Sequence, residues 1–191
     1  MSVVIENLKE AIKGENNAKR KYELYAEQAK KENLPEIAHL FKAVSIAEAI
    51  HIKNHTRALQ ILSKSEINID DFVEVNEVTL MNNVKNTKSN LLAGINGETY
   101  ETKQMYKIFM KNSKKEGNDI AELSFSLARK AEKVHARIFS SYLKQLKKNE
   151  SLEKNKKIFV CQICGNIEFD SPPSICPLCE HTQKFFNEVK P

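Results

Sequence analysis

Two copies of one pattern of carboxylate and imidazole side chains stand out in the sequence. Each copy is a Glu followed some 33 residues later by Glu-x-x-His, and the two copies are Glu15, Glu48 and His51, then Glu98, Glu132 and His135. Residues three apart on a helix share one face, about 5–6 Å between Cβ atoms, so each Glu-x-x-His pair can bind one metal. The separations, 33 residues (15 to 48) and 34 (98 to 132), fit one long helix and the turn to the next. The sequence therefore predicts two helical hairpins with these groups facing inward.

The ligand types indicate which metals such hairpins would bind. A Glu from each of two helices and a Glu-x-x-His from each of two others is the ligand set of di-iron and di-manganese four-helix bundles. Carboxylate and imidazole suit iron or manganese, and the absence of thiolate from the pattern disfavours a structural zinc. A seventh candidate, Glu101, lies three residues after Glu98, where the first copy has Ala18. The two copies are therefore not equivalent.

A second candidate metal site lies in the last 31 residues, which contain all four cysteines as Cys161-x-x-Cys164 and Cys176-Pro177-x-Cys179. In a reducing cytosol this spacing indicates a metal site rather than disulfides. Four thiolates from two tight turns close a tetrahedron that suits zinc or iron. We expect an apolar shell around it from Phe159, Phe169, Phe185 and Phe186.

Helices must position the first set of ligands. Apolar residues recur at helical spacing, Gly and Pro number five each and Trp is absent, which favours a mostly α protein. The predicted helices span residues 3–32, 35–62, 89–116 and 119–148. Ser2 is placed to cap the first, and Pro35 suits the first turn of the second. On the inner faces of the last two helices we expect, among others, Leu92, Ile108 and Leu123.

The remaining segments set the domain organisation. The connection over 63–87 is polar and longer than a hairpin turn needs, because it must cross the bundle before the third helix starts. The same length also allows a domain-swapped dimer. A charged stretch over 148–157 predicts a linker between a bundle over 1–147 and a small metal-binding domain over 158–191.

Two other histidines have spacings that compete with the ligand pattern. His39 ends a Glu36-x-x-His39 motif, but Glu36 lies twelve residues before Glu48 and so faces about 120° away. We expect His39 at the surface or in packing. His55 lies one turn after His51, where it either supports the site or is exposed; we favour an exposed or interface position.

Charge and hydropathy limit the partners. The net charge is +5, with lysines interleaved among Glu and Asn, which is typical of solvated helix faces rather than a nucleic-acid surface. No apolar run approaches the ~20 residues of a membrane span, and the N-terminus lacks the features of a signal peptide. We expect a cytoplasmic protein without a nucleic-acid or membrane partner.

Over nearly its whole length the chain resembles the rubrerythrins, members of the ferritin-like superfamily. The motifs that carry the resemblance are Gly14-Glu15, Ala47-Glu48-x-x-His51, Gly97-Glu98-x-x-Glu101, Ala131-Glu132-x-x-His135 and the tail Cys161-x-x-Cys164-Gly165 with Cys176-Pro177-x-Cys179. The resemblance implies a ferritin-like four-helix bundle with a di-iron centre, followed by a rubredoxin-like domain with one iron in the four-cysteine site, where zinc is the alternative. Asn166 departs from the family, which commonly has an aromatic residue there, and no Trp precedes the first Cys; both bear on the shielding of the iron.

The same resemblance implies an activity. It implies a non-haem di-iron peroxidase that reduces hydrogen peroxide to water in oxidative-stress defence, with electrons relayed through the FeS4 centre from a rubredoxin or an NAD(P)H-dependent rubredoxin reductase. It implies that one iron leaves Glu101 for His51 on reduction. It also implies that Tyr22 and Tyr106 are phenols bonded to ligand carboxylates, with ordinary core tyrosines as the alternative. A homodimer, head-to-tail or larger, is expected because electron transfer along one chain would be too long.

Two other functions use the same residues. A ferroxidase or iron-storage protein needs the same bundle, but it gives no reason for a tetrathiolate tail. A protein with a zinc-ribbon docking module behind a bundle of structural metals would be colourless and contain zinc.

Overall fold

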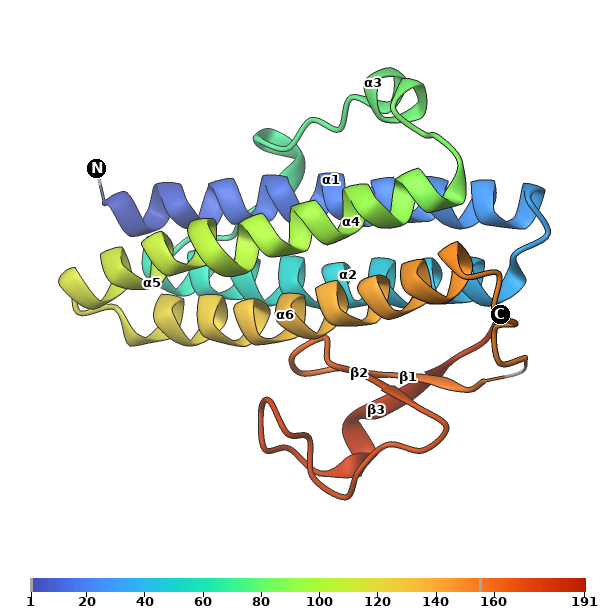
Figure 1. The fold of residues 1–191 in the computed structure, drawn as a ribbon. Helices are drawn as coiled ribbons and strands as arrows, with labels where there is room; N and C mark the ends of the chain where they lie inside the picture. The colour runs from blue at the N-terminus through green and yellow to red at the C-terminus, as the bar shows by residue number, and fades with distance from the viewer. Residues whose placement is uncertain (1, 155) are drawn as a thin grey trace.

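The computed structural model describes residues 2–154 and 156–191, so Met1 and residue 155 of the expected linker lie outside the described residues. Four long antiparallel helical segments form a bundle, and a small β domain lies along one side of it (Figure 1). The helical elements are α1 (Val3–Lys31), α2 (Pro35–Ser63), α3 (Glu77–Asn82), α4 (Thr87–Tyr100), α5 (Tyr106–Lys115) and α6 (Asp119–Lys147). The mostly α fold expected from the sequence is confirmed.

Side-chain caps and turn residues define the helix ends. The Ser2 hydroxyl accepts from the Ile5 N–H at 3.4 Å, and Pro35 begins α2. Asn118 caps α6 through the Ala121 N–H at 3.1 Å, directly after Gly117, whose φ of +66° ends the preceding helix. These local choices give two hairpins, α1–α2 and α4–α6, whose inner faces meet.

The third long segment differs from its expected form as one regular α-helix. A π-helical turn, Glu101–Met105, separates α4 from α5. The Arg129 side chain of α6 donates through Nε to the Thr102 carbonyl in this turn at 2.8 Å, and so satisfies a backbone group of the irregular segment. A single π-turn inserts one residue into a helix without ending it, and such turns are frequent at functional sites.

The connection between the hairpins crosses the bundle. It contains a 3-10 turn, Ile69–Asp71, and α3, which lies outside α1 (Figure 1). Arg20 of α1 donates through Nε to both carboxylate oxygens of Glu77 at 2.9 Å. At the far end, the Thr87 N–H donates to Glu32, so α4 begins where α1 ends. One chain thus supplies all four segments of the described bundle.

Two apolar clusters fill the bundle, and a polar layer separates them. Along α1 one cluster takes Val4, Leu8 and Ile12, and the other begins at Ala18, so Glu15 falls between them. The expectation that Leu92, Ile108 and Leu123 face inward is wrong, because these side chains are 48%, 56% and 61% exposed. Leu91 takes the core position beside Leu92, and after the π-turn Tyr106 and Phe109 face inward in place of Ile108.

The tail is a three-stranded antiparallel sheet with the order β2-β1-β3. Its strands are β1 (Ile158–Cys161), β2 (Ile167–Phe169) and β3 (Phe186–Val189). The sheet packs against α2 and α6, and Ile158 and Val160 join one of the bundle's apolar clusters (Figure 1). His39 is buried here, with Nε2 donating to the Val189 carbonyl at 2.8 Å, which is the packing role expected for it. Among the described helices, none is long and apolar enough to cross a membrane.

Candidate two-metal centre and tetrathiolate site

The six repeated carboxylate and imidazole residues converge in the polar layer of the bundle. α1 supplies Glu15, α2 supplies Glu48 and His51, α4 supplies Glu98, and α6 supplies Glu132 and His135, all at most 1% exposed. Their ligand atoms form two groups with atoms within 4.8 Å of one another: Glu15, Glu48, His51 and Glu132, then Glu48, Glu98, Glu132 and His135. Glu48 and Glu132 belong to both groups, so they are placed to bridge two metal ions.

The polar atoms of this layer lack the partners that burial requires. Buried oxygens of Glu15, Glu48, Glu98 and Glu132, together with His51 Nδ1, have no hydrogen-bond partner among the described residues. His51 Nδ1 lies 2.7, 3.0 and 3.5 Å from oxygens of Glu132, Glu48 and Glu15. Ligand atoms about 2.1 Å from one ion lie about 3–4 Å from each other. An unpaired buried carboxylate is costly, so these atoms fit bound metal ions.

The opposite edges of the two imidazoles face the tail. Nε2 of His51 donates to the Cys164 carbonyl at 3.1 Å, and Nε2 of His135 donates to the Gly165 carbonyl at 3.0 Å. A carbonyl only accepts, so these bonds place a proton on Nε2 of each ring. Nδ1 of each ring faces the carboxylates, with His135 Nδ1 2.8 Å from Glu132 Oε2, and is the atom that would bind metal. Gly165 permits the approach: its φ is +77°, and a Cβ there would lie 2.6 Å from His51 Nε2.

The carboxylates and histidines perturb one another strongly. Burial, and then the charges of Glu132 and Glu98, raises the pKa of Glu48 well above its usual value. Burial and the charge of Glu132 raise the pKa of Glu98 to about 7. Burial alone would lower the pKa of His51, but Glu132 and Glu15 outweigh it and raise that pKa well above its usual value. Without metal the site therefore retains protons near neutral pH, and bound cations would displace them.

Glu101 lies at the start of the π-turn, outside both ligand groups. Burial and the charge of Glu15, followed by those of Glu98, Glu132 and Glu48, raise its pKa well above its usual value. The Glu101 side chain therefore lies near the ligand carboxylates. The ligand group that contains Glu15 includes His51 and not Glu101. The sequence contained a signal for the π-turn: Tyr22 follows Glu15 by seven residues, whereas Tyr106 follows Glu98 by eight.

The two tyrosines bond to ligand carboxylates across the hairpins. Tyr22 of α1 donates to Glu98 Oε1, and Tyr106 of α5 donates to Glu15 Oε1. Each phenol is at most 1% exposed, and burial followed by the charge of its partner raises its pKa well above the usual value. The two tyrosines are therefore bonded to ligand carboxylates and are not ordinary core tyrosines.

His55 is the residue that sequence reasoning placed wrongly. It is fully buried rather than exposed, with Nε2 3.0 Å from the Tyr106 hydroxyl and Nδ1 2.7 Å from the Ser124 hydroxyl. Burial and the charge of His51 lower its pKa to about 3, so the ring is neutral. The helical spacing of His51 and His55 was the available signal, since residues four apart share a face.

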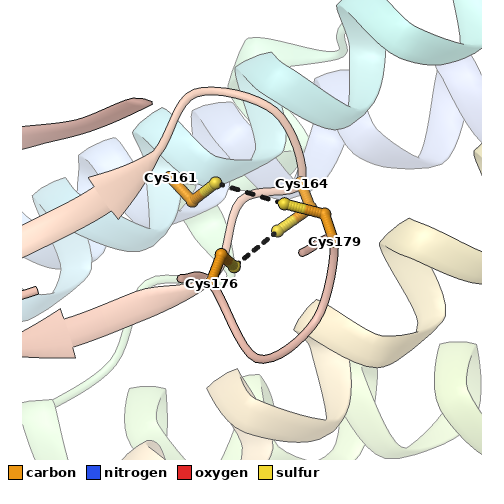
Figure 2. Close-up of side chains that lie close together, drawn as sticks. All are labelled: Cys161, Cys164, Cys176 and Cys179. Atoms are coloured by element: carbon orange, nitrogen blue, oxygen red, sulfur yellow. Dashed lines mark hydrogen bonds between the residues drawn. The ribbon is translucent and has the colours of Figure 1, made fainter. Parts of the chain in front are cut away.

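The four cysteines lie at one end of the tail's sheet and point toward one another from two loops (Figure 2). Sγ–Sγ distances are 3.7 Å for Cys161–Cys179 and for Cys164–Cys176, and all four are free thiols. Four sulfurs about 2.3 Å from one ion lie about 3.8 Å apart in a tetrahedron. The bond from the Cys164 side chain, with backbone N–H groups, lowers the pKa of Cys161 to about 5. The bond to Cys161 raises the pKa of Cys164, and burial raises that of Cys179 to about 12, so the metal-free cluster holds protons that a bound cation would displace.

The shell of this site differs in part from the expected one. Phe186 and Phe159 pack around the sulfurs with Leu127 of α6, whereas Phe169 stacks on Tyr142 and Phe185 meets His181. Asn166, the departure noted in the sequence, is 1% exposed, and its side-chain amide points to Cys176 Sγ at 3.9 Å. It thus places a polar group, rather than an aromatic ring, beside a ligand sulfur.

Comparison with known proteins decides the family. The family model described as rubrerythrin matches residues 6–143, and the model for the rubrerythrin rubredoxin-like domain matches residues 159–187. The chain belongs to the rubrerythrin family. It is 34% identical to Rubrerythrin-2 of Clostridium acetobutylicum over 172 residues, covering 90% of this chain and 89% of that one.

A second relative and its solved structure agree with this assignment. Identity to nigerythrin of Nitratidesulfovibrio vulgaris is 34% over 175 residues, covering 92% of this chain and 81% of that one. A solved nigerythrin structure in its fully reduced, all-ferrous state superimposes with a TM-score of 0.81 at 30% identity, covering 98% of this chain and 87% of that one. The expected ferritin-like bundle followed by a rubredoxin-like domain is confirmed, and both predicted metal sites fall inside the matched regions.

Proposed function

We propose that this rubrerythrin is a non-haem di-iron peroxidase that reduces hydrogen peroxide to water in oxidative-stress defence, fed by electrons through an FeS4 centre in the tail. The observation that carries the proposal is the direct contact between the two-metal site and the tetrathiolate loop. The Nε2–H groups of His51 and His135 donate to successive carbonyls of the Cys161–Gly165 loop, at 3.1 and 3.0 Å. One hydrogen bond thus separates each histidine from the loop that carries two of the thiolates.

The bundle residues would hold the two-metal centre, and the four cysteines would hold the iron that passes electrons to it. When bound, two ferrous ions would each supply one electron to a peroxide O–O bond, and a tetrathiolate iron would pass single electrons. Glu48 and Glu132, which belong to both ligand groups, would hold both ions, and the bonds from Tyr22 and Tyr106 fix the outer carboxylates Glu98 and Glu15. The all-ferrous state of the related nigerythrin structure supports iron in the bundle.

Glu101 and His51 serve as alternative ligands at the position nearest Glu15. His51 Nδ1 lies within the ligand group and Glu101 lies outside it, at the start of a π-turn of the kind that is frequent at functional sites. Replacing Glu101 with Ala should lower peroxide turnover about tenfold while two metals remain bound. Turnover equal to that of the wild type would contradict the exchange.

The electron donor and the assembly are further parts of the proposal. Electrons would enter at the outer knuckle, where Cys179 is half-buried and Ile175 is 56% exposed, from a rubredoxin or an NAD(P)H-dependent rubredoxin reductase. Because the tail lies against its own bundle, a long path along one chain is no longer a reason for a head-to-tail dimer. A homodimer remains a prediction based on the family, and size measurement in solution tests it.

The deciding experiment is rapid mixing of the reduced protein. The protein would be purified without added metal, reduced anaerobically and mixed separately with hydrogen peroxide and with oxygen, while the colour of the oxidised FeS4 centre is followed. Glu132→Ala is the matched control, because it removes a bridging ligand and leaves all four cysteines.

Each outcome has one meaning. Fast return of colour with peroxide, slow return with oxygen and slow return in the control would support the peroxidase and its relay. Faster return with oxygen would favour a ferroxidase or oxidase. A colourless protein containing zinc would exclude the relay.

A further inference from the structure

A buried chain of hydrogen bonds leads away from Glu15 toward the surface. Tyr106 donates to Glu15 Oε1, His55 Nε2 lies 3.0 Å from the Tyr106 oxygen, and His55 Nδ1 lies 2.7 Å from the Ser124 oxygen. Tyr106 and His55 are fully buried, whereas Ser124 on α6 is 7% exposed. The three side chains therefore connect the ligand layer to the edge of the bundle.

The direction of each bond follows from the number of hydrogens. The single hydroxyl hydrogen of Tyr106 is donated to the carboxylate, so the phenol oxygen must accept from His55 Nε2–H. The ring of His55 is neutral, and its Nδ1 therefore carries a lone pair and accepts the Ser124 hydroxyl hydrogen. All three bonds run the same way, from Ser124 to Glu15, which is the arrangement that a proton-transfer chain requires.

Within the part of the chain that the structure describes, the other half of the bundle has no such chain. Phe139 lies four residues after His135, as His55 lies four after His51, and its ring centroid is 5.4 Å from that of Tyr22. Tyr22 also stacks on Phe41 at 6.0 Å, so its hydroxyl bonds to Glu98 while its ring lies among aromatic groups. The repeat thus provides an internal comparison: the same tyrosine–carboxylate pair with a polar route behind one copy only.

We propose that Ser124, His55 and Tyr106 form a proton-transfer chain that delivers protons from the edge of the bundle to the Glu15 side of the two-metal site. This inference rests on the proposed function, because reducing one hydrogen peroxide to two waters consumes two electrons and two protons. For each proton, Tyr106 passes its hydrogen to Glu15 Oε1, His55 Nε2 reprotonates Tyr106, Ser124 protonates His55 Nδ1 and water reprotonates Ser124. Each passage moves the His55 hydrogen from Nε2 to Nδ1. Before the next proton can move, His55 must return to the Nε2–H tautomer by exchange with solvent, and the Tyr106 and Ser124 hydroxyl groups must rotate back.

Two substitutions at one position separate proton transfer from positioning. His55→Phe reproduces the other half and removes both ring nitrogens. His55→Gln keeps an amide N–H that can donate to Tyr106 but cannot take up and release a proton. Both variants should retain two bundle metals, and both should slow single-turnover reoxidation about tenfold, with a changed solvent deuterium isotope effect. Ser124→Ala should slow it less, because water can replace a hydroxyl near the surface.

The oxidant for this comparison is whichever of hydrogen peroxide and oxygen the wild-type protein reduces faster. A preference for oxygen would overturn the proposed function but would still allow the chain to be tested, since oxygen reduction also consumes protons. A wild-type rate and isotope effect in His55→Gln would overturn the chain and leave His55 as a positioning residue for Tyr106.

A second readout does not depend on turnover. Nitrogen-15 NMR of histidine-labelled, metal-free protein should show the proton of His55 on Nε2, with the assignment made by its loss in His55→Gln. A proton on Nδ1 would reverse the bond to Tyr106 and overturn the proposal, whatever the reaction rates.

Discussion

The α1–α2 hairpin and the α4–α6 hairpin each supply two carboxylates and one histidine to the two-metal site. The spacing between the two carboxylates is one residue longer in the second hairpin. Glu48 follows Glu15 by 33 residues, whereas Glu132 follows Glu98 by 34. The π-turn Glu101–Met105 accommodates that extra residue within the helix. The ligand frame is therefore symmetric even though the helices that carry it are not.

The differences between the hairpins concentrate at one of the two metal positions. The group that contains Glu15 and His51 receives the bond from Tyr106 and has His55 behind it. After burial, the charge of Glu15 is the largest cause of the raised pKa of Glu101. The group that contains Glu98 and His135 has the aromatic surroundings of Tyr22 instead. The repeated residues hold metal, and the unrepeated ones supply an alternative ligand and a proton route, so we infer that the reactive change occurs on the Glu15 side.

The largest expected effect is loss of metal when a carboxylate shared by both ligand groups, such as Glu132, is replaced, compared with replacement of an outer carboxylate such as Glu98. Glu132→Gln should leave the bundle without either metal, because Glu132 belongs to both ligand groups. Glu98→Gln should retain one ion in the group of Glu15 and His51. Metal analysis per chain, with the tetrathiolate metal counted from its colour, checks both variants. Two bundle metals in Glu132→Gln would show that the halves bind independently.

The metal-free protein should become less stable as pH rises from about 5 to about 8. Glu98, with a folded pKa of about 7, holds its proton in the folded chain after the unfolded chain has lost it. The raised pKa values of Glu48, His51 and His135 act in the same direction. The lowered pKa of His55, about 3, acts in the opposite direction up to about pH 6.5, but this one group does not cancel the combined effect of Glu48 and Glu98. The folded state thus binds more protons, so the free energy of unfolding falls by about 1.4 kcal/mol per pH unit for each excess proton.

Thermal unfolding with and without metal measures this effect. The metal-loaded protein should show no such fall, because binding displaces those protons and strengthens with pH. The gap between the two melting temperatures should therefore widen toward pH 8, and a gap that narrows would contradict the assigned shifts.

Gly165→Ala should disturb the His51 half more than the His135 half. Gly165 and Gly117 both have positive φ, and an alanine in that conformation costs about 1–2 kcal/mol. At Gly165 the added Cβ would also lie 2.6 Å from His51 Nε2, whereas at Gly117 it would meet nothing within 4 Å. Only Gly165→Ala should therefore slow electron transfer between the tail and the bundle, measured as the return of FeS4 colour, with Gly117→Ala as the control.

The sequence predicted the parts of the molecule that follow periodic rules. Paired motifs such as Glu132-x-x-His135 and the two Cys-x-x-Cys loops gave ligand types and spacing, and apolar periodicity gave four helices. It did not predict which face Leu92, Ile108 and Leu123 would take. The π-turn changes the register before Ile108, whereas the nearby apolar residues Leu91 and Phe125 take the core positions in place of Leu92 and Leu123. Helical spacing placed His55 on the same face as His51, but its bonds to Tyr106 and Ser124, like the contact of His51 with the Cys164 carbonyl, depend on packing between segments far apart in sequence, which local patterns do not encode.

The smallest expected effect concerns the glycine before each outer ligand. Gly14 and Gly97 precede Glu15 and Glu98 in the two halves, both inside helices, where glycine costs roughly 0.5–1 kcal/mol relative to alanine. A Cβ at Gly14 would meet nothing within 4 Å, and at Gly97 it would meet the flexible end of Lys21 at 3.5 Å. Gly14→Ala and Gly97→Ala should therefore each raise the free energy of unfolding by about 0.5–1 kcal/mol. If Gly14→Ala alone slows the reaction with peroxide, the glycine serves the reactive Glu15 side rather than the fold, and the two halves differ at this repeated position as well.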